Sequence, residues 1–185
     1  TIMPYSITTP IVSKMDPVCK EFVSGRKSFL FIGQLIKRKA VDILLKSFSQ
    51  CEDIDNSWCL LLIGIGNAQR QLTNLAVQLQ IDHKTLFRGP VPSNSISSVF
   101  SLGSVLILPS RDDGWGVVLN EGSALGLPLI ASNRVGAGYH LIDPGVNGFR
   151  VLAGCSESLA EAMQTYINNP DLIAAHGVAS KRNFS

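Results

Sequence analysis

The chain has 185 residues, of which 45% are hydrophobic and only 16% are charged, a composition that favours one globular domain with an apolar core over a disordered chain. A formal net charge of +2 is too small to indicate nucleic-acid binding, and no apolar run approaches the roughly 18 residues of a membrane helix. The four cysteines are scattered and the three histidines lie far apart, which favours reduced thiols in a cytosolic protein and indicates no metal site.

The N-terminal part predicts a linker, then a strand and a helix. Residues 1–27 carry three prolines and little periodicity, so we expect a linker or a segment that wraps onto the domain. Residues 28–33 form an apolar run that predicts the first buried strand. After a basic loop, residues 41–48 repeat apolar side chains at helical spacing. The domain itself is expected to cover residues 28–185.

The next unit ends its strand in a glycine turn. Residues 58–66 predict a second buried strand, followed by a helix over residues 68–79. Gly64 and Gly66 resemble part of a dinucleotide-binding fingerprint, but Gln69 stands where its third glycine would be. The two glycines are therefore compatible with a structural turn or with a nucleotide contact.

The centre of the chain predicts a strand, a glycine-bearing loop and a helix. Residues 85–88 predict a short strand and residues 95–102 a short helix, before the central strand at residues 105–108. A helix is expected from about residue 117 to residue 125, where Gly126 ends it. The first N–H groups of such a helix lack internal partners and carry the positive end of its dipole, which suits an anion.

Two acids flank the start of this helix. Asp113 lies in the loop and Glu121 lies eight positions later, where its side chain leans back toward the helix N-terminus. A carboxylate beside a phosphate site is suited to accept hydrogen bonds from neighbouring sugar hydroxyls. Taken alone, Asp113 is more simply interpreted as a turn former and Glu121 as a solvated helix residue, but the glycines, the tryptophan and the preceding strand favour the binding role.

The C-terminal part predicts a last strand between helices. A short helix is expected over residues 139–142, and Asn147-Gly148 indicates a hairpin turn into the strand. Amphipathic helices are expected over residues 156–167 and 171–181.

Strands that alternate with helices predict an α/β fold, a three-layer Rossmann-like domain with a mostly parallel sheet flanked by helices. Ligands of such sheets bind at the carboxyl ends of the strands. Gly33, Gly64, Gly89 and Asp113 each follow a predicted strand, so we expect them to gather along that edge.

The central stretch is similar to the donor-site motif of the group 1 glycosyltransferases, retaining enzymes of the GT-B fold with two Rossmann-like domains. Their motif has two acids separated by seven residues, which are Asp113 and Glu121 here. It then continues with Gly-x-Pro-hydrophobic-Ile-Ala-Ser, which residues 126–132 match. The family usually has glutamate at the first position, so Asp113 is a departure.

The loop after the first strand also resembles the family, in which an arginine and a lysine hold the donor diphosphate. Gly33 and Lys39 match that pattern, whereas Gln34 stands where the arginine is usual and Ala40 where a glycine is usual. Lys37 or Arg38 could supply the missing cation, and the sequence leaves this open.

The resemblance covers residues 28–185 and implies a role for each matching position. Asp113 would hold the transferred sugar, Glu121 the ribose and Lys39 the diphosphate, and these three would be the catalytic residues. Arg88 would stack on the base or only cap its strand. The remaining donor contacts would come from Gly33, Gln34, Gly64, Gly66, Gly89, Gly114, Trp115, Gly116 and Val117. No cofactor and no metal are expected.

The implied function is that of the C-terminal, donor-binding half of a retaining hexosyltransferase that uses a nucleotide diphosphate sugar, in polysaccharide or glycolipid synthesis. The acceptor sugar or glycolipid would be bound by an N-terminal domain that this chain lacks, so the chain alone would turn over poorly. We expect a cytoplasmic enzyme with possible peripheral membrane association and no nucleic-acid partner. Two other functions stay open, a nucleotide-sugar 2-epimerase and a non-catalytic nucleotide-sugar-binding module.

Overall fold

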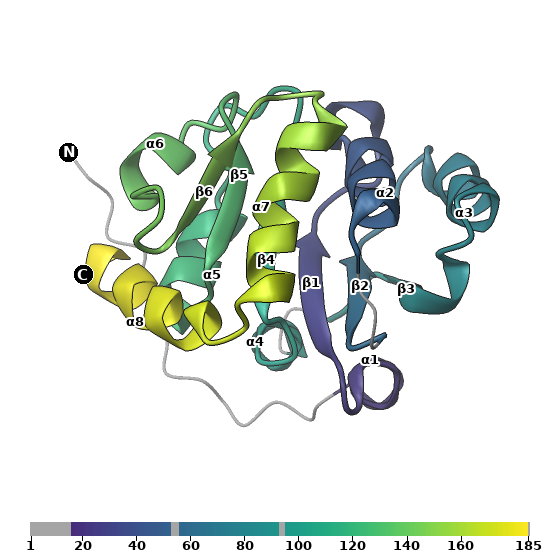
Figure 1. Cartoon of the computed structure of the whole chain (residues 1–185). Helices are drawn as coiled ribbons and strands as arrows, with labels where there is room; N and C mark the ends of the chain where they lie inside the picture. Colours follow the sequence, from purple (N-terminus) through teal and green to yellow (C-terminus); the bar gives the residue numbers. More distant parts are fainter. Residues whose placement is uncertain (1–15, 53–55, 93–94, 185) are drawn as a thin grey trace.

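The computed structural model describes residues 16–52, 56–92 and 95–184, and Figure 1 follows the chain through them. Residues 1–15, the larger part of the expected linker, lie outside the described residues. Within the described part, no helix combines the length and the apolar composition that crossing a membrane requires.

Six strands form one sheet in the order β3-β2-β1-β4-β5-β6, and every pair of neighbours is parallel. Almost all residues of β1, β2, β4 and β5 are buried, because helices cover both faces of a parallel sheet. The strands are β1 (Lys27–Ile32), β2 (Trp58–Ile63), β3 (Thr85–Gly89), β4 (Val105–Leu108), β5 (Leu129–Ser132) and β6 (Gly148–Val151). The predicted α/β fold is confirmed, with the described sheet parallel throughout.

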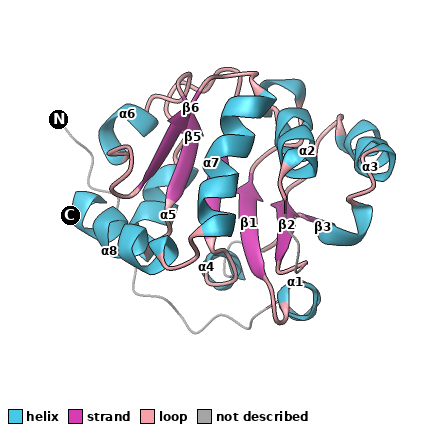
Figure 2. Cartoon of the chain, in the orientation of Figure 1, coloured by secondary structure: helices cyan, strands magenta, loops and turns pink. Residues whose placement is uncertain are grey.

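Helices pack on the two faces of this sheet, which gives the three layers seen in Figure 2. On one face α7 lies beside α2, where the Ser47 hydroxyl donates to the Ser156 carbonyl at 2.9 Å. On the other face α5 packs against α8, and the Ser123 hydroxyl donates to the Ser180 carbonyl at 2.8 Å. The helices are α1 (Pro17–Val23), α2 (Val41–Gln50), α3 (Gln69–Gln78), α4 (Ile96–Phe100), α5 (Val118–Leu125), α6 (Gly138–Leu141), α7 (Ser156–Asn168) and α8 (Leu172–Phe184), with short 3-10 turns at Lys37–Lys39 and Asp82–Lys84.

The core is centred on aromatic side chains between the sheet and α2. The ring of Phe29 stacks on that of Trp58 with their centroids 4.3 Å apart, and the ring of Phe48 meets Phe29 edge-on. Trp58 is only 1% exposed. This packing fixes β1 and β2, and with them the loops that follow both strands.

Helix α1 was not predicted from the sequence. Asp16 caps it by accepting a hydrogen bond from the backbone N–H of Cys19 at 3.0 Å, and Pro17 occupies its first turn. The helix packs against β3 and β2. Residues 17–23 thus pack onto the domain, within the segment expected to be a linker or to wrap onto it.

The hairpin predicted at Asn147-Gly148 is wrong, because β6 runs parallel to β5. The buried side chain of Asn147 instead accepts from the N–H of Asp143 and donates to the Leu141 carbonyl, both at 2.7 Å. Gly148 begins β6 at a close approach, where a Cβ atom would lie 1.9 Å from the Leu129 carbonyl oxygen. Asn147 thus serves the loop and Gly148 the close contact with β5. Because the two residues are adjacent in the sequence, they look like a hairpin turn.

Candidate functional site

The loops after the first strands meet at the carboxyl edge of the sheet, the edge toward which β1 points in Figure 1. The N–H of Gly33 donates to the Ile63 carbonyl at 2.9 Å, and the N–H of Gly64 donates to the Gly89 carbonyl at 3.0 Å. These contacts bring Gly33, Gly64 and Gly89 together, as the sequence predicts.

Lys39 reaches from the β1–α2 loop to Asp113 in the β4–α5 loop and forms an ion pair with it. The lysine side chain is 15% exposed and the carboxylate side chain 12% exposed. Nη1 of Arg38 lies 3.8 Å from the same carboxylate and donates to the Asp112 carbonyl at 3.1 Å. Ala40, which follows Lys39, has a φ of 55°, a left-handed conformation that glycine adopts without strain. Ala40 therefore has the backbone conformation that the family's usual glycine adopts without strain.

A second ion pair, which the sequence analysis missed, ties the same two loops together. The guanidinium of Arg111 binds the carboxylate of Asp42 at 2.8 and 2.7 Å and also donates to the Lys37 carbonyl at 2.7 Å. Burial alone would raise the pKa of Asp42, but hydrogen bonds and charge from Arg111 outweigh it and hold this pKa below its ordinary value. No sequence motif marks the pair, because its members are 69 positions apart.

The backbone of the β4–α5 loop is fixed against the loop that follows β5. The N–H of Asp113 donates to the Arg134 carbonyl at 2.9 Å, and the N–H of Ala137 donates to the Trp115 carbonyl at 2.8 Å. A Cβ atom on Gly136 would lie 2.3 Å from the Gly114 carbonyl oxygen, so the two loops touch through backbone. The loop is therefore held in one shape before any ligand arrives.

This fixed loop presents free donors at the N-terminus of α5. The N–H groups of Gly114, Trp115, Gly116 and Val117 have no hydrogen-bond acceptor among the described residues. Gly116 has a φ of 85°, a conformation that turns the chain into the helix and that glycine tolerates. Unpaired N–H groups at a helix N-terminus form a site for an anion such as a phosphate.

Two side chains of the same segment are Glu121, in the first turn of α5, and Trp115, in the loop before it. The Glu121 side chain makes no hydrogen bond or ion pair with any residue that the structure describes. It is exposed, yet surrounding protein atoms displace enough water to raise the pKa of its carboxyl. The Trp115 ring is 44% exposed, donates from Nε1 to the Asn120 side chain at 2.9 Å and lies 5.4 Å from the ring of His140.

An apolar pocket of about 330 Å³ opens at the carboxyl ends of β1, β2 and β3. It is lined by Ile32, Gly33, Gln34, Ile63, Gly64, Ile65, Pro90, Val91 and Ile96. A Cβ atom on Gly64 would lie 1.9 Å from the Gly33 carbonyl oxygen, and one on Gly66 would lie 2.2 Å from that of Leu35. Both glycines are thus needed for close contact between two protein loops.

Arg88 is already paired in this structure. Its guanidinium binds Asp16, with Nη2 2.8 Å from Oδ2 and Nε 3.1 Å from both carboxylate oxygens. Hydrogen bonds from Arg88 lower the pKa of Asp16 to about 2. The pair anchors α1 to β3.

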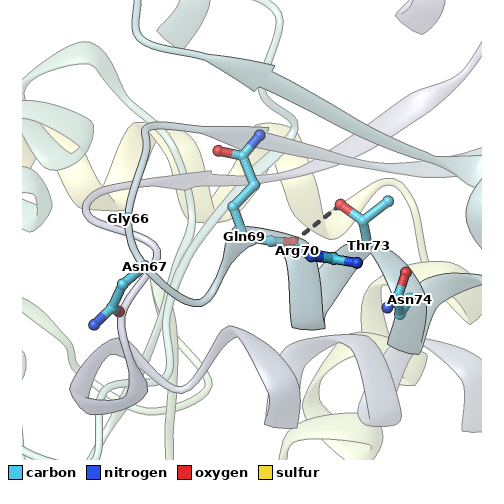
Figure 3. A pocket seen from close by; sticks show the side chains of 6 residues that line it. All are labelled: Gly66, Asn67, Gln69, Arg70, Thr73 and Asn74. Atoms are coloured by element: carbon cyan, nitrogen blue, oxygen red, sulfur yellow. Dashed lines mark hydrogen bonds between the residues drawn. The ribbon is translucent and has the colours of Figure 1, made fainter.

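A larger hollow, of about 500 Å³, lies along the first half of α3 (Figure 3). It is open, and its lining holds no carboxylate: Gly66, Asn67, Gln69, Arg70, Thr73 and Asn74. Apart from Gly66, none of the predicted site residues contributes to it. In the part of the chain that is described, no three of His, Cys, Asp and Glu gather as metal ligands.

Comparison with known proteins identifies the family. The family profile described as glycosyl transferases group 1 matches residues 17–182. An uncharacterized glycosyltransferase of Haemophilus influenzae is 31% identical over 147 residues, which cover 79% of this chain and 41% of that protein. A D-inositol 3-phosphate glycosyltransferase of Streptomyces griseus is 31% identical over 160 residues, covering 82% of this chain and 34% of that protein. The chain thus spans less than half the length of these relatives.

Solved structures share the fold. Anabaena HepE in complex with UDP and glucose superimposes with a TM-score of 0.81 at 21% identity, over 92% of this chain and 48% of that one. The C-terminal domain of a group 1 glycosyl transferase from Francisella tularensis gives a TM-score of 0.80 at 18% identity, over 93% of both chains. The sequence resemblance and the expected half of a GT-B fold are therefore confirmed, and the chain belongs to the group 1 glycosyltransferase family.

Proposed function

We propose that this chain binds a nucleotide diphosphate sugar at the carboxyl edge of the sheet, as the donor half of a retaining glycosyltransferase. The observation that carries the proposal is the arrangement around the start of α5. Free N–H groups lie at the start of α5, Glu121 lies in its first turn, and the Lys39–Asp113 ion pair joins the neighbouring loops of that edge.

Each part of a sugar nucleotide has a chemically matching position. The diphosphate would lie between Lys39, which is a cation, and the N–H groups of residues 114–117, which have no acceptor among the described residues. The base would enter the apolar pocket beside Gly33 and Gln34. Glu121 would accept hydrogen bonds from ribose hydroxyls, and Asp113 would accept them from the sugar.

The chemistry follows from these positions. Transfer would break the bond between the anomeric carbon and the β-phosphate oxygen and form one to the acceptor hydroxyl oxygen, which loses its proton. Negative charge therefore grows on the leaving phosphate. The fixed N–H groups would stabilise that charge without rearranging, because the loop is already held by Arg134 and Ala137. Lys39 would add its charge once it has exchanged Asp113 for the phosphate. Retention of the anomeric configuration and independence from metal are carried over from the family resemblance as predictions.

The acceptor would be bound elsewhere in the whole protein, since the matched relatives are more than twice as long as their matched part. A hexose acceptor or a glycolipid, a cytoplasmic setting and peripheral membrane association stay predictions. Without an acceptor held against the anomeric carbon in a water-poor cleft, we expect the chain alone to bind the donor but to transfer sugar poorly.

A thermal-shift and calorimetry screen against UDP-, GDP- and ADP-sugars tests the proposal. We expect a rise in the unfolding temperature with sugars of one base, and UDP is the first choice because HepE was solved with UDP and glucose. A wild-type chain that binds none of these donors would refute it. Incubation with donor alone distinguishes a 2-epimerase, which would isomerise the sugar without an acceptor.

A further inference from the structure

The two charged side chains that the proposed function assigns to different parts of the donor bind each other in this structure. Lys39, assigned to the diphosphate, is paired with Asp113, assigned to the sugar. Both side chains are mostly buried, at 15% and 12% exposure. A ligand that takes one of them therefore leaves the other without its partner, in surroundings where an unpaired charge is unfavourable.

We propose that the Lys39–Asp113 pair makes the site select the complete sugar nucleotide over the free nucleoside diphosphate. The inference rests on the proposed function. A sugar nucleotide compensates both halves of the broken pair, because its phosphate replaces Asp113 at Lys39 and its sugar hydroxyls replace Lys39 at Asp113. A nucleoside diphosphate compensates only Lys39 and leaves the Asp113 carboxylate unpaired beside a phosphate.

The neighbouring groups cannot fully replace Lys39. Arg111 is held by Asp42 through two hydrogen bonds. Arg38 is 3.8 Å from the Asp113 carboxylate, but it is 47% exposed and already donates to the Asp112 carbonyl. Arg38 therefore offsets part of the charge that Lys39 leaves behind, which limits the size of the discrimination.

The Asp113 carboxylate also has little freedom to move away. Its backbone N–H donates to the Arg134 carbonyl at 2.9 Å, and its carbonyl accepts from the N–H of Gly136 at 3.2 Å. Only the short side chain can rotate. After sugar transfer the site would hold a nucleoside diphosphate and an unpaired Asp113, so re-forming the ion pair favours release of that product.

Calorimetry with UDP and with UDP-glucose tests the inference on the wild-type chain and on Asp113→Asn, after the base has been chosen by the donor screen. Removing the carboxylate frees Lys39, so we expect UDP to bind about three- to tenfold more tightly. UDP-glucose should gain less or lose affinity, because its sugar loses an acceptor. Asp112→Asn is the matched control, since it removes the same charge from an exposed neighbour and should leave both affinities within about twofold.

The Lys39→Ala background separates pair competition from general repulsion of phosphate. There Asp113→Asn should no longer tighten UDP binding, as expected for two coupled residues. Tightening that persists without Lys39, or an unchanged or weaker UDP affinity in Asp113→Asn with an unchanged thermal unfolding curve, overturns the inference and leaves the proposed function standing. A wild-type chain that binds neither nucleotides nor sugar nucleotides of any base overturns both.

Discussion

Arg111, in the loop that follows β4, and Asp42, in the first turn of α2, form a two-point ion pair with N–O distances of 2.8 and 2.7 Å. The pair spans the two loops that carry Asp113 and Lys39. A guanidinium binds a carboxylate in a fixed plane, whereas an ammonium acts as a point charge. The pair therefore sets how the two loops face each other, in addition to joining them.

We predict that Arg111→Lys weakens donor binding more than it weakens folding. Both side chains are about a third exposed, so the free energy of unfolding should fall by less than about 1 kcal/mol. Sugar-nucleotide affinity should fall about three- to tenfold, because Lys39 is less well positioned. Urea unfolding and calorimetry measure the two quantities. Arg182→Lys, an exposed arginine at the end of α8, should change neither.

His176 gives the folded chain a pH dependence near neutrality. Its Nδ1 lies 2.8 Å from the hydroxyl of buried Tyr166, and burial lowers its pKa below the ordinary 6.5. The unfolded chain thus binds a proton first as the pH falls. The contribution of His176 to the free energy of unfolding is fully present above about pH 6.5. It is lost as the pH falls from there toward the lower pKa of the folded state.

Thermal unfolding between pH 8 and pH 5 measures this effect. His176→Gln should flatten the decline, although it should lower stability at pH 8 by about 1–2 kcal/mol through the lost contact with Tyr166. His83→Gln is the control, because His83 is exposed and should leave the slope unchanged. An equal slope in the wild type and in His176→Gln would assign the pH dependence to other groups.

Gly66 is predicted to be required for folding, because it lets two loops touch through their backbones. An alanine there would place its Cβ atom 2.2 Å from the Leu35 carbonyl oxygen, so backbone must shift. We expect Gly66→Ala to lower the free energy of unfolding by roughly 2–4 kcal/mol. Gly114→Ala has open space around its Cβ position and should be nearly neutral in urea unfolding. Comparable stabilities of the two variants would contradict the prediction.

Glu121→Ala is predicted to weaken nucleotide binding without unfolding the chain. Loss of a charged acceptor should cost roughly 1.5–3 kcal/mol, about a 10- to 150-fold lower affinity by calorimetry. Glu121 is exposed and has no partner among the described residues, so its removal should leave the unfolding temperature nearly unchanged. Glu161→Ala on α7 removes an equal charge far along the chain and should bind normally. Unchanged affinity in Glu121→Ala would remove this residue from the site.

Trp115 should report donor binding by its fluorescence. The chain has two tryptophans, and Trp58 is 1% exposed in the core whereas Trp115 is 44% exposed in the α5 loop. A ligand on the N–H groups of this loop changes the surroundings of Trp115 alone. We expect a saturable change in emission on titration with a sugar nucleotide, and its disappearance in Trp115→Phe at unchanged affinity.

Local patterns were sufficient to predict most of the fold. The apolar runs became strands and the helical repeats became helices, with ends that agree within about three residues, because burial on both sheet faces dictates such runs. The exceptions have physical reasons. Helix α1 is short and depends on the cap at Asp16 and the contact with Arg88, and Asn147-Gly148 serves a buried loop and a close strand contact.

The sequence by itself determined the alternation of strands and helices, the carboxyl edge as the place of the proposed site, and the spacing of Asp113 and Glu121, since these depend on near neighbours in the chain. Only the tertiary structure decided which charges meet. Lys39 with Asp113, Arg111 with Asp42 and Arg88 with Asp16 are joined across 69 to 74 positions. Such pairs leave no local pattern, because the sheet order rather than the chain order brings their loops together.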